Sequence, residues 1–173
     1  VSDNAAALST YGPINSWDVS LITDMGQLFK EKTTFNDDIG NWDVSNVTTM
    51  SDMFYIAESF NQDISGWDVS NVTYMSWMFR NATNFNQDIS SWNVSNVTHM
   101  TGLFAGTNFN QDISGWDVSN VTYMGHMFFY AYAFNQDISD WDLSNVINME
   151  NMFTGASALS DENKCAIHAS FQS

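Results

Sequence analysis

Apolar and polar positions follow a pattern that repeats about every 25 residues along most of this 173-residue chain. An M-x-x-[M/L]-F motif comes eight residues after each of six regularly spaced tryptophans, and it contains all ten methionines. The tryptophans that mark the period are Trp17, Trp42, Trp67, Trp92, Trp116 and Trp141. A period between 20 and 50 residues indicates a repeat architecture, in which each unit stacks on the next.

Two hydrophobic periods coexist inside one unit, as the third unit (64–88) shows. Residues 67–69 read Trp-Asp-Val, an alternation that predicts a short half-buried strand. Apolar residues within 72–79 are spaced by three and by one, which predicts one stripe of a short helix or 3₁₀ turn. No unit can bury its apolar side chains alone. We therefore expect six stacked units with one shared core.

The ends of the chain are expected to cover the open ends of such a stack. In this interpretation residues 1–13 form a short N-terminal cap, residues 14–158 form the six repeats, and residues 159–173 form a C-terminal capping helix of the same domain. Ser160 is the expected N-cap of that helix, since two acidic residues follow it in the first turn.

The repeat resembles that of a known family. The string V-S-N-V-T-x-M-x-x-M-F-x-N-A-T-x-F, seen at 69–85, is similar to the repeat of the BspA-like leucine-rich-repeat surface proteins, and the likeness extends over residues 14–159. The resemblance implies a leucine-rich-repeat-like solenoid, with short parallel strands on one face and short helical or 3₁₀ turns on the other. It also implies a secreted or cell-surface location and a role in adhesion. Trp, Met and Phe stand where that family mostly has Leu.

The charge balance excludes some partners. The chain has 20 acidic residues and four basic ones, and its net charge is −16. Nucleic acid is not an expected partner, because phosphate binding depends on clustered Lys and Arg. No apolar run approaches the roughly 20 residues that span a bilayer, so no membrane span is expected. Cations, basic proteins and neutral glycans all fit this charge.

Aspartates recur at one position of the unit and are expected to form a row across the stack, about 4.8 Å apart. Two hypotheses explain this row. Its carboxylates could bind Ca²⁺, which prefers oxygen ligands, and no other cofactor is expected. They could instead accept local hydrogen bonds in turns, which Asn93, a neutral residue within the row, favours. The candidate metal ligands are Asp43, Asp68, Asp117 and Asp142.

A threonine row also recurs, and it has two explanations. Regular threonines on a flat face bind ice, whereas hydroxyl groups that bond to the neighbouring unit would be structural. Only one threonine per unit is regular, so we favour the second explanation. The row comprises Thr23, Thr48, Thr73, Thr98 and Thr122.

Binding specificity in a repeat protein is expected where the units differ. The third to fifth units concentrate aromatic residues that the others lack, and Arg80, Phe129 and Tyr132 accompany them. Exposed Trp and Tyr are typical of glycan stacking and of protein hot spots, although scattered exposed aromatics or packing against loops would give the same pattern. The candidate ligand-binding residues are Tyr74, Trp77, His99, Tyr123, His126 and Tyr130.

The sequence contains no constellation typical of an enzyme. Its three histidines have no matching cysteine, and no phosphate-binding loop or dinucleotide fingerprint is present. We therefore predict a non-catalytic binding or adhesion module, secreted or at the cell surface, that recognises a protein or a glycan. The alternative is a protein that binds divalent cations, a mineral or ice through its Asp and Thr rows.

Overall fold

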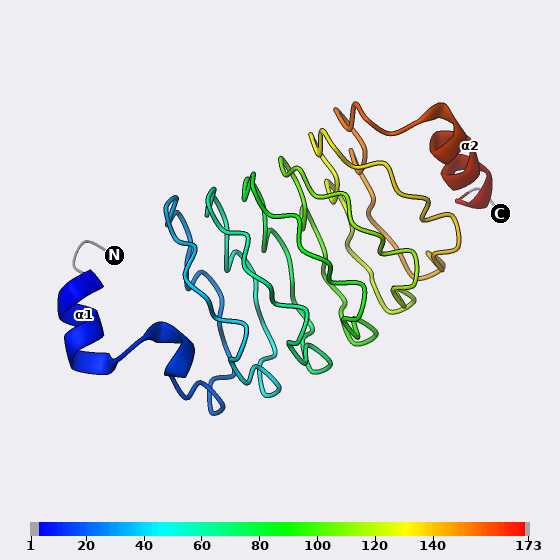
Figure 1. Cartoon of the computed structure of the whole chain (residues 1–173). Helices are drawn as coiled ribbons and strands as arrows, with labels where there is room; N and C mark the ends of the chain where they lie inside the picture. The colour runs from blue at the N-terminus through cyan, green and yellow to red at the C-terminus, as the bar shows by residue number, and fades with distance from the viewer. Residues whose placement is uncertain (1–3, 172–173) are drawn as a thin grey trace.

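The computed structural model describes residues 4–171, which form three helices and six stacked coils. Figure 1 shows the coils side by side, with α1 (Asn4–Tyr11) at one end and α2 (Asp161–Ser170) at the other. The 3₁₀ helix η1 (Ile14–Ser16) opens the first coil. We number the coils one to six as residues 14–38, 39–63, 64–88, 89–112, 113–137 and 138–158. Residues 1–3 and 172–173 of the predicted caps lie outside the described residues.

The predicted leucine-rich-repeat-like fold class is wrong, because it requires a sheet on one face and helical turns on the other. In residues 4–171 no strand forms, and only isolated parallel bridges join single residues of successive coils. Between Trp17 and Ser160 the described chain contains no helix of any kind. The bridged row is Asp24, Thr49, Tyr74, His99, Tyr123 and Asn148.

The predicted strand at 67–69 does not form, because backbone groups around it bond locally. The Trp67 N–H donates to the Ile64 carbonyl at 3.1 Å, and the Val72 N–H donates to the Val69 carbonyl at 2.9 Å. Both bonds close tight turns. Trp67 and Val69 are nonetheless buried, while the residue between them is exposed. The alternation thus reports which side chains face the core and not how the backbone is paired.

The M-x-x-M-F segment forms a ladder of turns where a helix was predicted. In coil three the N–H groups of Met75, Trp77, Phe79 and Asn81 each donate to a carbonyl of coil four at 2.8–3.1 Å. The N–H groups of Met78 and Arg80, which lie between them, bond to the carbonyl three positions back. A helix would direct every N–H to the carbonyl four positions back, so the two arrangements exclude each other.

Left-handed backbone makes this ladder possible. Trp77 and Asn81 have φ of 60° and 56°, the sign that the third residue of a type II turn requires. Equivalent residues of every coil do the same, including the β-branched Ile56. A side chain in this region costs about 1 kcal/mol, and the stack supplies enough packing to hold it. The other left-handed residues of the coils are Gln27, Glu31, Asp52, Gly102, Gly106, His126, Tyr130, Asn151 and Gly155.

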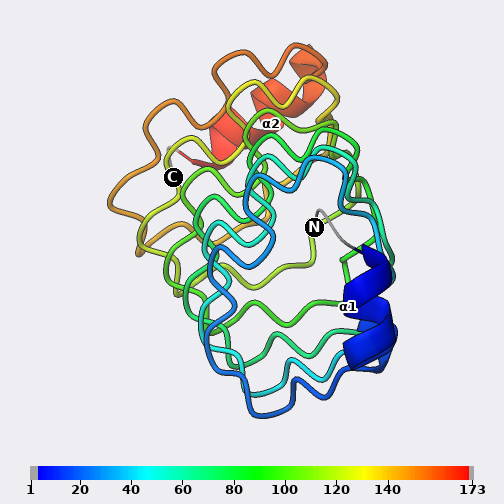
Figure 2. The same cartoon turned by 90° about the vertical axis from the view of Figure 1, so that its left-hand side faces the viewer.

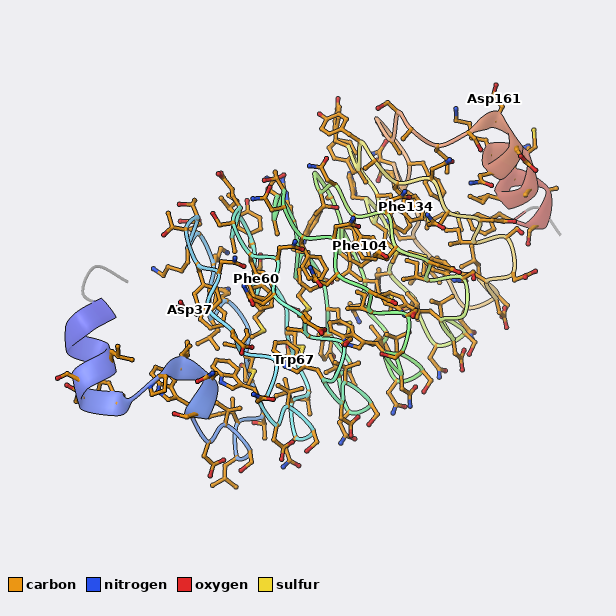
Figure 3. All side chains as sticks on the ribbon, viewed as in Figure 1. Asp37, Phe60, Trp67, Phe104, Phe134 and Asp161 are labelled. Carbon is orange, nitrogen blue, oxygen red and sulfur yellow. The ribbon has the colours of Figure 1, made fainter. Side chains whose placement is uncertain are left out.

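The core is a set of side-chain columns that run the length of the stack. The rings of Phe79 and Phe85 stack within one coil at 3.9 Å, and Phe79 stacks on Phe104 of the next coil at 5.9 Å. Figure 2 looks along the stack and shows the coils lying one behind another. In Figure 3, Phe60, Phe104 and Phe134 follow one another through its interior.

Repeated polar residues join one coil to the next. Each Asn of one row accepts a backbone N–H bond from the next coil; Asn86 Oδ1, for example, accepts from Asn110 N at 2.8 Å. The Trp67 indole N–H donates to a carbonyl of coil two at 3.1 Å. Thr98 Oγ1 donates to the Thr73 carbonyl at 3.2 Å. Thr48, Thr73 and Thr122 donate to the preceding coil in the same way. These threonine bonds confirm the structural explanation of the threonine row.

The two ends are covered differently. Helix α2 is present as predicted: the Ser160 side chain accepts from the Asn163 N–H, and Ile167 is buried against coil six. Helix α1 forms within the predicted N-terminal cap, but its Leu8 and Tyr11 are exposed. None of the helices among residues 4–171 is long and apolar enough to cross a membrane.

Candidate functional site

The carboxylates of the aspartate row accept hydrogen bonds within their own turns. Asp43 Oδ1 accepts from both the backbone N–H and the hydroxyl of Ser45, at 3.1 and 2.6 Å. Asp117 accepts both bonds from Ser119 in the same way, while Asp68 and Asp142 accept the backbone N–H of the serine two residues later. Asn93 makes the equivalent bonds to Ser95 without a charge. These contacts confirm the local hydrogen-bond interpretation of the row.

The same bonds lower the pKa values of the carboxyl groups in the row. The Ser45 hydroxyl, and after it the Ser45 backbone N–H, hold the pKa of the exposed Asp43 carboxyl below its usual value. At Asp142 the backbone N–H of Ser144 has the larger effect on the pKa. Residues 4–171 contain no group of three His, Cys, Asp or Glu side chains that could hold a metal ion. Calcium binding by the row stays a prediction.

Three of the predicted ligand-binding residues form one exposed row, which we call the aromatic row. His99 lies between Tyr74 and Tyr123, with ring centroids 4.8 and 4.7 Å away. These residues belong to the bridged row of coils three to five. His99 Nδ1 is hydrogen-bonded to Thr98 Oγ1 at 2.8 Å, which sets the orientation of the imidazole. Both tyrosines present part of their rings to solvent.

A second group forms where coil four has small residues. Trp77 of coil three lies across Gly102, and a Cβ atom at that glycine would collide with the indole ring. The same indole reaches to 6.1 Å from the ring of His126, two coils away from its own. The missing side chain at Gly102 therefore gives Trp77 its position.

Arg80 stands beside this tryptophan. Its guanidinium carbon lies 4.7 Å from the Trp77 ring and 5.5 Å from the Tyr55 ring. Within the described chain the Arg80 guanidinium makes no ion pair and no hydrogen bond, whereas Lys30 and Lys164 each pair with an aspartate. Stacking on two rings holds the guanidinium in place and leaves its N–H donors available.

Residues of coils three, four and five line a hollow of about 350 Å³, which we call the coil-four hollow. Its coil-three side is polar and its coil-five side is aromatic. Ala105 and Gly106 of coil four form its floor, and a Cβ atom at Gly106 would collide with the Asn81 side chain. On the coil-five side the rings of Phe129, Tyr130 and Tyr132 form a chain, with successive centroids 4.5 and 5.8 Å apart. The complete lining is Arg80, Asn81, Thr83, Ala105, Gly106, Phe129, Tyr130 and Tyr132.

Larger hollows lie at the ends of the stack, but they have a structural cause. One, of about 400 Å³, is lined by Leu28, Phe29 and Phe35 of the first coil. Another, of about 600 Å³, is lined by Met152, Leu159 and Ile167. Except for Ile167 of α2, these residues belong to the repeated columns of the coils, which neighbouring coils cover everywhere else. The end hollows therefore reflect partial covering of the core.

The structure divides the six predicted residues into two groups. Tyr74, His99 and Tyr123 stack on one another, while Tyr130 lines the coil-four hollow and Trp77 and His126 flank it. Arg80, Phe129 and Tyr132, which the sequence places beside the candidate residues, also line the hollow, whereas Asn81, Thr83 and the small residues of coil four were missed. The signal for the small residues was present in the repeat, since the fourth unit has small residues in three columns where its neighbours have large ones. Those small residues are Gly102, Ala105 and Gly106.

These features define a class of protein: a stack of turn-built coils whose constant residues hold the stack together and whose variable residues form an aromatic edge. The chain belongs to the family described as "Mycoplasma protein of unknown function, DUF285", whose model matches residues 2–108 and 90–166. No curated protein and no solved structure matches the chain. The family description assigns no activity, so the function has to be argued from the site.

Proposed function

We propose that this chain is a non-catalytic binding module, secreted or displayed at a cell surface, that recognises a glycan in the coil-four hollow. One observation supports this most strongly. Ala105 and Gly106 form a small-residue floor between an aromatic wall on coil five and a polar wall on coil three. Apolar pockets with a few placed polar groups are the usual form of a small-ligand site.

The size of the hollow favours a sugar over a protein as the occupant. A hollow of about 350 Å³ falls within the range of small-ligand pockets, which is about 300–1,000 Å³. Tyr130 and Tyr132 present exposed ring faces that can stack on a sugar. Asn81 and Thr83 supply an amide and a hydroxyl for hydrogen bonds to sugar hydroxyl groups.

The alternative prediction, binding of cations, a mineral or ice through the Asp and Thr rows, lacks comparable support. The carboxylates of the row bind their own turns, and the threonine hydroxyls bind the preceding coil. Both rows thus have a structural role that explains why they recur in each unit. The variable residues of coils three to five have no such explanation.

Glycan-array binding by Tyr132→Ala tests the proposal. Tyr132 is 54% exposed, so its truncation should leave the melting temperature within about a degree and lower glycan binding about tenfold or more. Tyr11→Ala is the matched control, because Tyr11 is 69% exposed and lies in α1. Equal glycan binding by the two variants, or binding only to a protein, would refute a glycan site in the hollow.

A further inference from the structure

We infer that the coil-four hollow selects a carboxylated sugar, and that the Arg80 guanidinium binds its carboxylate. This inference rests on the proposed glycan-binding function and names the class of sugar. It requires a cation at the hollow that is not neutralised by the protein, and aromatic rings on which the sugar can stack. It also requires a reason why the ligand carries one carboxylate and not many. Each requirement is met by named residues.

Arg80 is an unneutralised cation in a strongly acidic protein. The chain has 20 acidic and four basic residues, yet no carboxylate of the described residues pairs with Arg80. Its counter-ion must therefore come from solvent or from a ligand. A guanidinium presents five N–H donors in a planar fork that matches a carboxylate, and such charge-assisted pairs are the stronger hydrogen bonds.

The guanidinium is also held in position before any ligand arrives. Trp77 and Tyr55 stack against it, and Trp77 itself is seated over Gly102. Binding would then not require ordering of a long flexible side chain, which costs about 0.5–1.5 kcal/mol. Gly102 is thus a positioning residue for Arg80, acting through the indole ring.

The aromatic side of the hollow and the net charge of the chain indicate the ring and the number of carboxylates that the ligand should have. Arg80 lines the hollow from coil three and Tyr132 lines it from coil five, so a sugar stacked on Tyr132 can direct a carboxylate to Arg80. The Tyr130 ring lies against Gly155 of coil six. A polymer with an acid on every residue would be repelled by a net charge of −16. One carboxylated sugar at the end of a glycan places a single negative charge beside Arg80 and none elsewhere.

Calorimetric titration with three simple sugars tests the inference. The probes are methyl β-D-glucuronide, its neutral counterpart methyl β-D-glucoside, and the 6-sulfate of that glucoside. We expect the glucuronide to bind about tenfold or more tightly than either of the others at physiological salt. In Arg80→Gln this preference should disappear, and in Arg80→Lys it should be intermediate, because an ammonium keeps the charge and loses the fork.

Lys32→Gln is the matched control, because it removes one positive charge from exposed Lys32 of coil one. Its glucuronide preference should equal that of the parent chain, with unchanged melting temperatures in all three variants. Equal binding of glucuronide and glucoside, both lost in Tyr132→Ala, would overturn the inference and leave the glycan function standing. Tighter binding of the sulfate would overturn the choice of a carboxylate. Binding of none of the probes would overturn the inference, and the glycan array would then decide the function separately.

Discussion

The interior of the stack and the surface of coils three to five around the coil-four hollow differ in how regularly their side chains repeat. In the interior nearly the same side chains recur in every coil, and each contacts its equivalent in the next, as Phe79 does with Phe104. At the edge, large side chains of coils three and five face small ones of coil four, as Trp77 faces Gly102. Regularity stabilises the stack, while the break in regularity creates a hollow. Mutations in the two regions should therefore have different effects.

Truncation in the interior should cause the largest loss of stability. Phe104 is fully buried and stacks on Phe79, Phe109 and Phe128. We expect Phe104→Ala to lower the free energy of unfolding by about 3–5 kcal/mol in a denaturant titration. Tyr132→Ala at the edge should change it by less than about 0.5 kcal/mol. Similar losses from both variants would contradict the comparison.

The row of asparagines that join successive coils should show the next largest loss of stability when it is mutated. Asn86→Ala removes the acceptor of the Asn110 N–H and should cost about 0.5–1.5 kcal/mol, the net contribution of a typical hydrogen bond to stability. Asn86→Asp keeps an oxygen in the same place and serves as the control. Chemical denaturation of both variants checks this, and an equal loss would show that the hydrogen bond is not the cause.

Acid should weaken the turns that the aspartate row closes. A carboxyl whose pKa is lower in the folded chain stabilises the fold above its unfolded pKa of about 3.9. That stabilisation is lost as the pH falls through the folded value. Hydrogen bonds from Ser45 and Ser119 lower the pKa of Asp43 and Asp117 in this way. The melting temperature should therefore hold between about pH 7 and pH 5 and fall below about pH 4.

A matched variant isolates this contribution of the row. With Asp43, Asp68, Asp117 and Asp142 all changed to Asn, the turns should keep their hydrogen bonds, as Asn93 does, and lose this part of the acid response. An unchanged acid response in thermal melts of the variant would assign the effect to other carboxyl groups.

Relief of backbone strain should raise stability by a smaller amount. Gln27 is exposed and has φ of 63°, a conformation that glycine adopts without a steric penalty. Gln27→Gly should therefore increase the free energy of unfolding by about 0.5–1 kcal/mol in denaturant titrations. Gly102→Ala is the converse change and should both lower stability and displace Trp77. A loss of stability in Gln27→Gly would contradict the assigned backbone conformation.

Calcium should have the smallest effect, and it tests the prediction that the Asp row binds metal. Occupation of one site at a hundred times its dissociation constant would add about 2.7 kcal/mol to the stability. Because the row already binds its own turns, we expect equal melting temperatures in excess calcium and in excess chelator. A saturable increase that the four Asn changes abolish would instead establish a cation site.

Much of this protein can be predicted from its sequence, because a period of about 25 residues is a one-dimensional property. The sequence alone indicates six units, a shared core of Trp, Val, Met and Phe, and exposed aromatics in the third to fifth units. It also predicts the N-cap at Ser160, since capping depends on a few neighbouring residues.

Only the tertiary structure decides how the backbone of each coil is bonded. Spacings of three and one in M-x-x-M-F fit a helix as well as a ladder of turns, because both place the same side chains inward. The ladder forms because alternate N–H groups, such as that of Met75, find acceptors in the next coil. The hollow likewise depends on three coils at once: Arg80 and Tyr130 are 50 residues apart in sequence, and stacking over Gly106 brings them to one site.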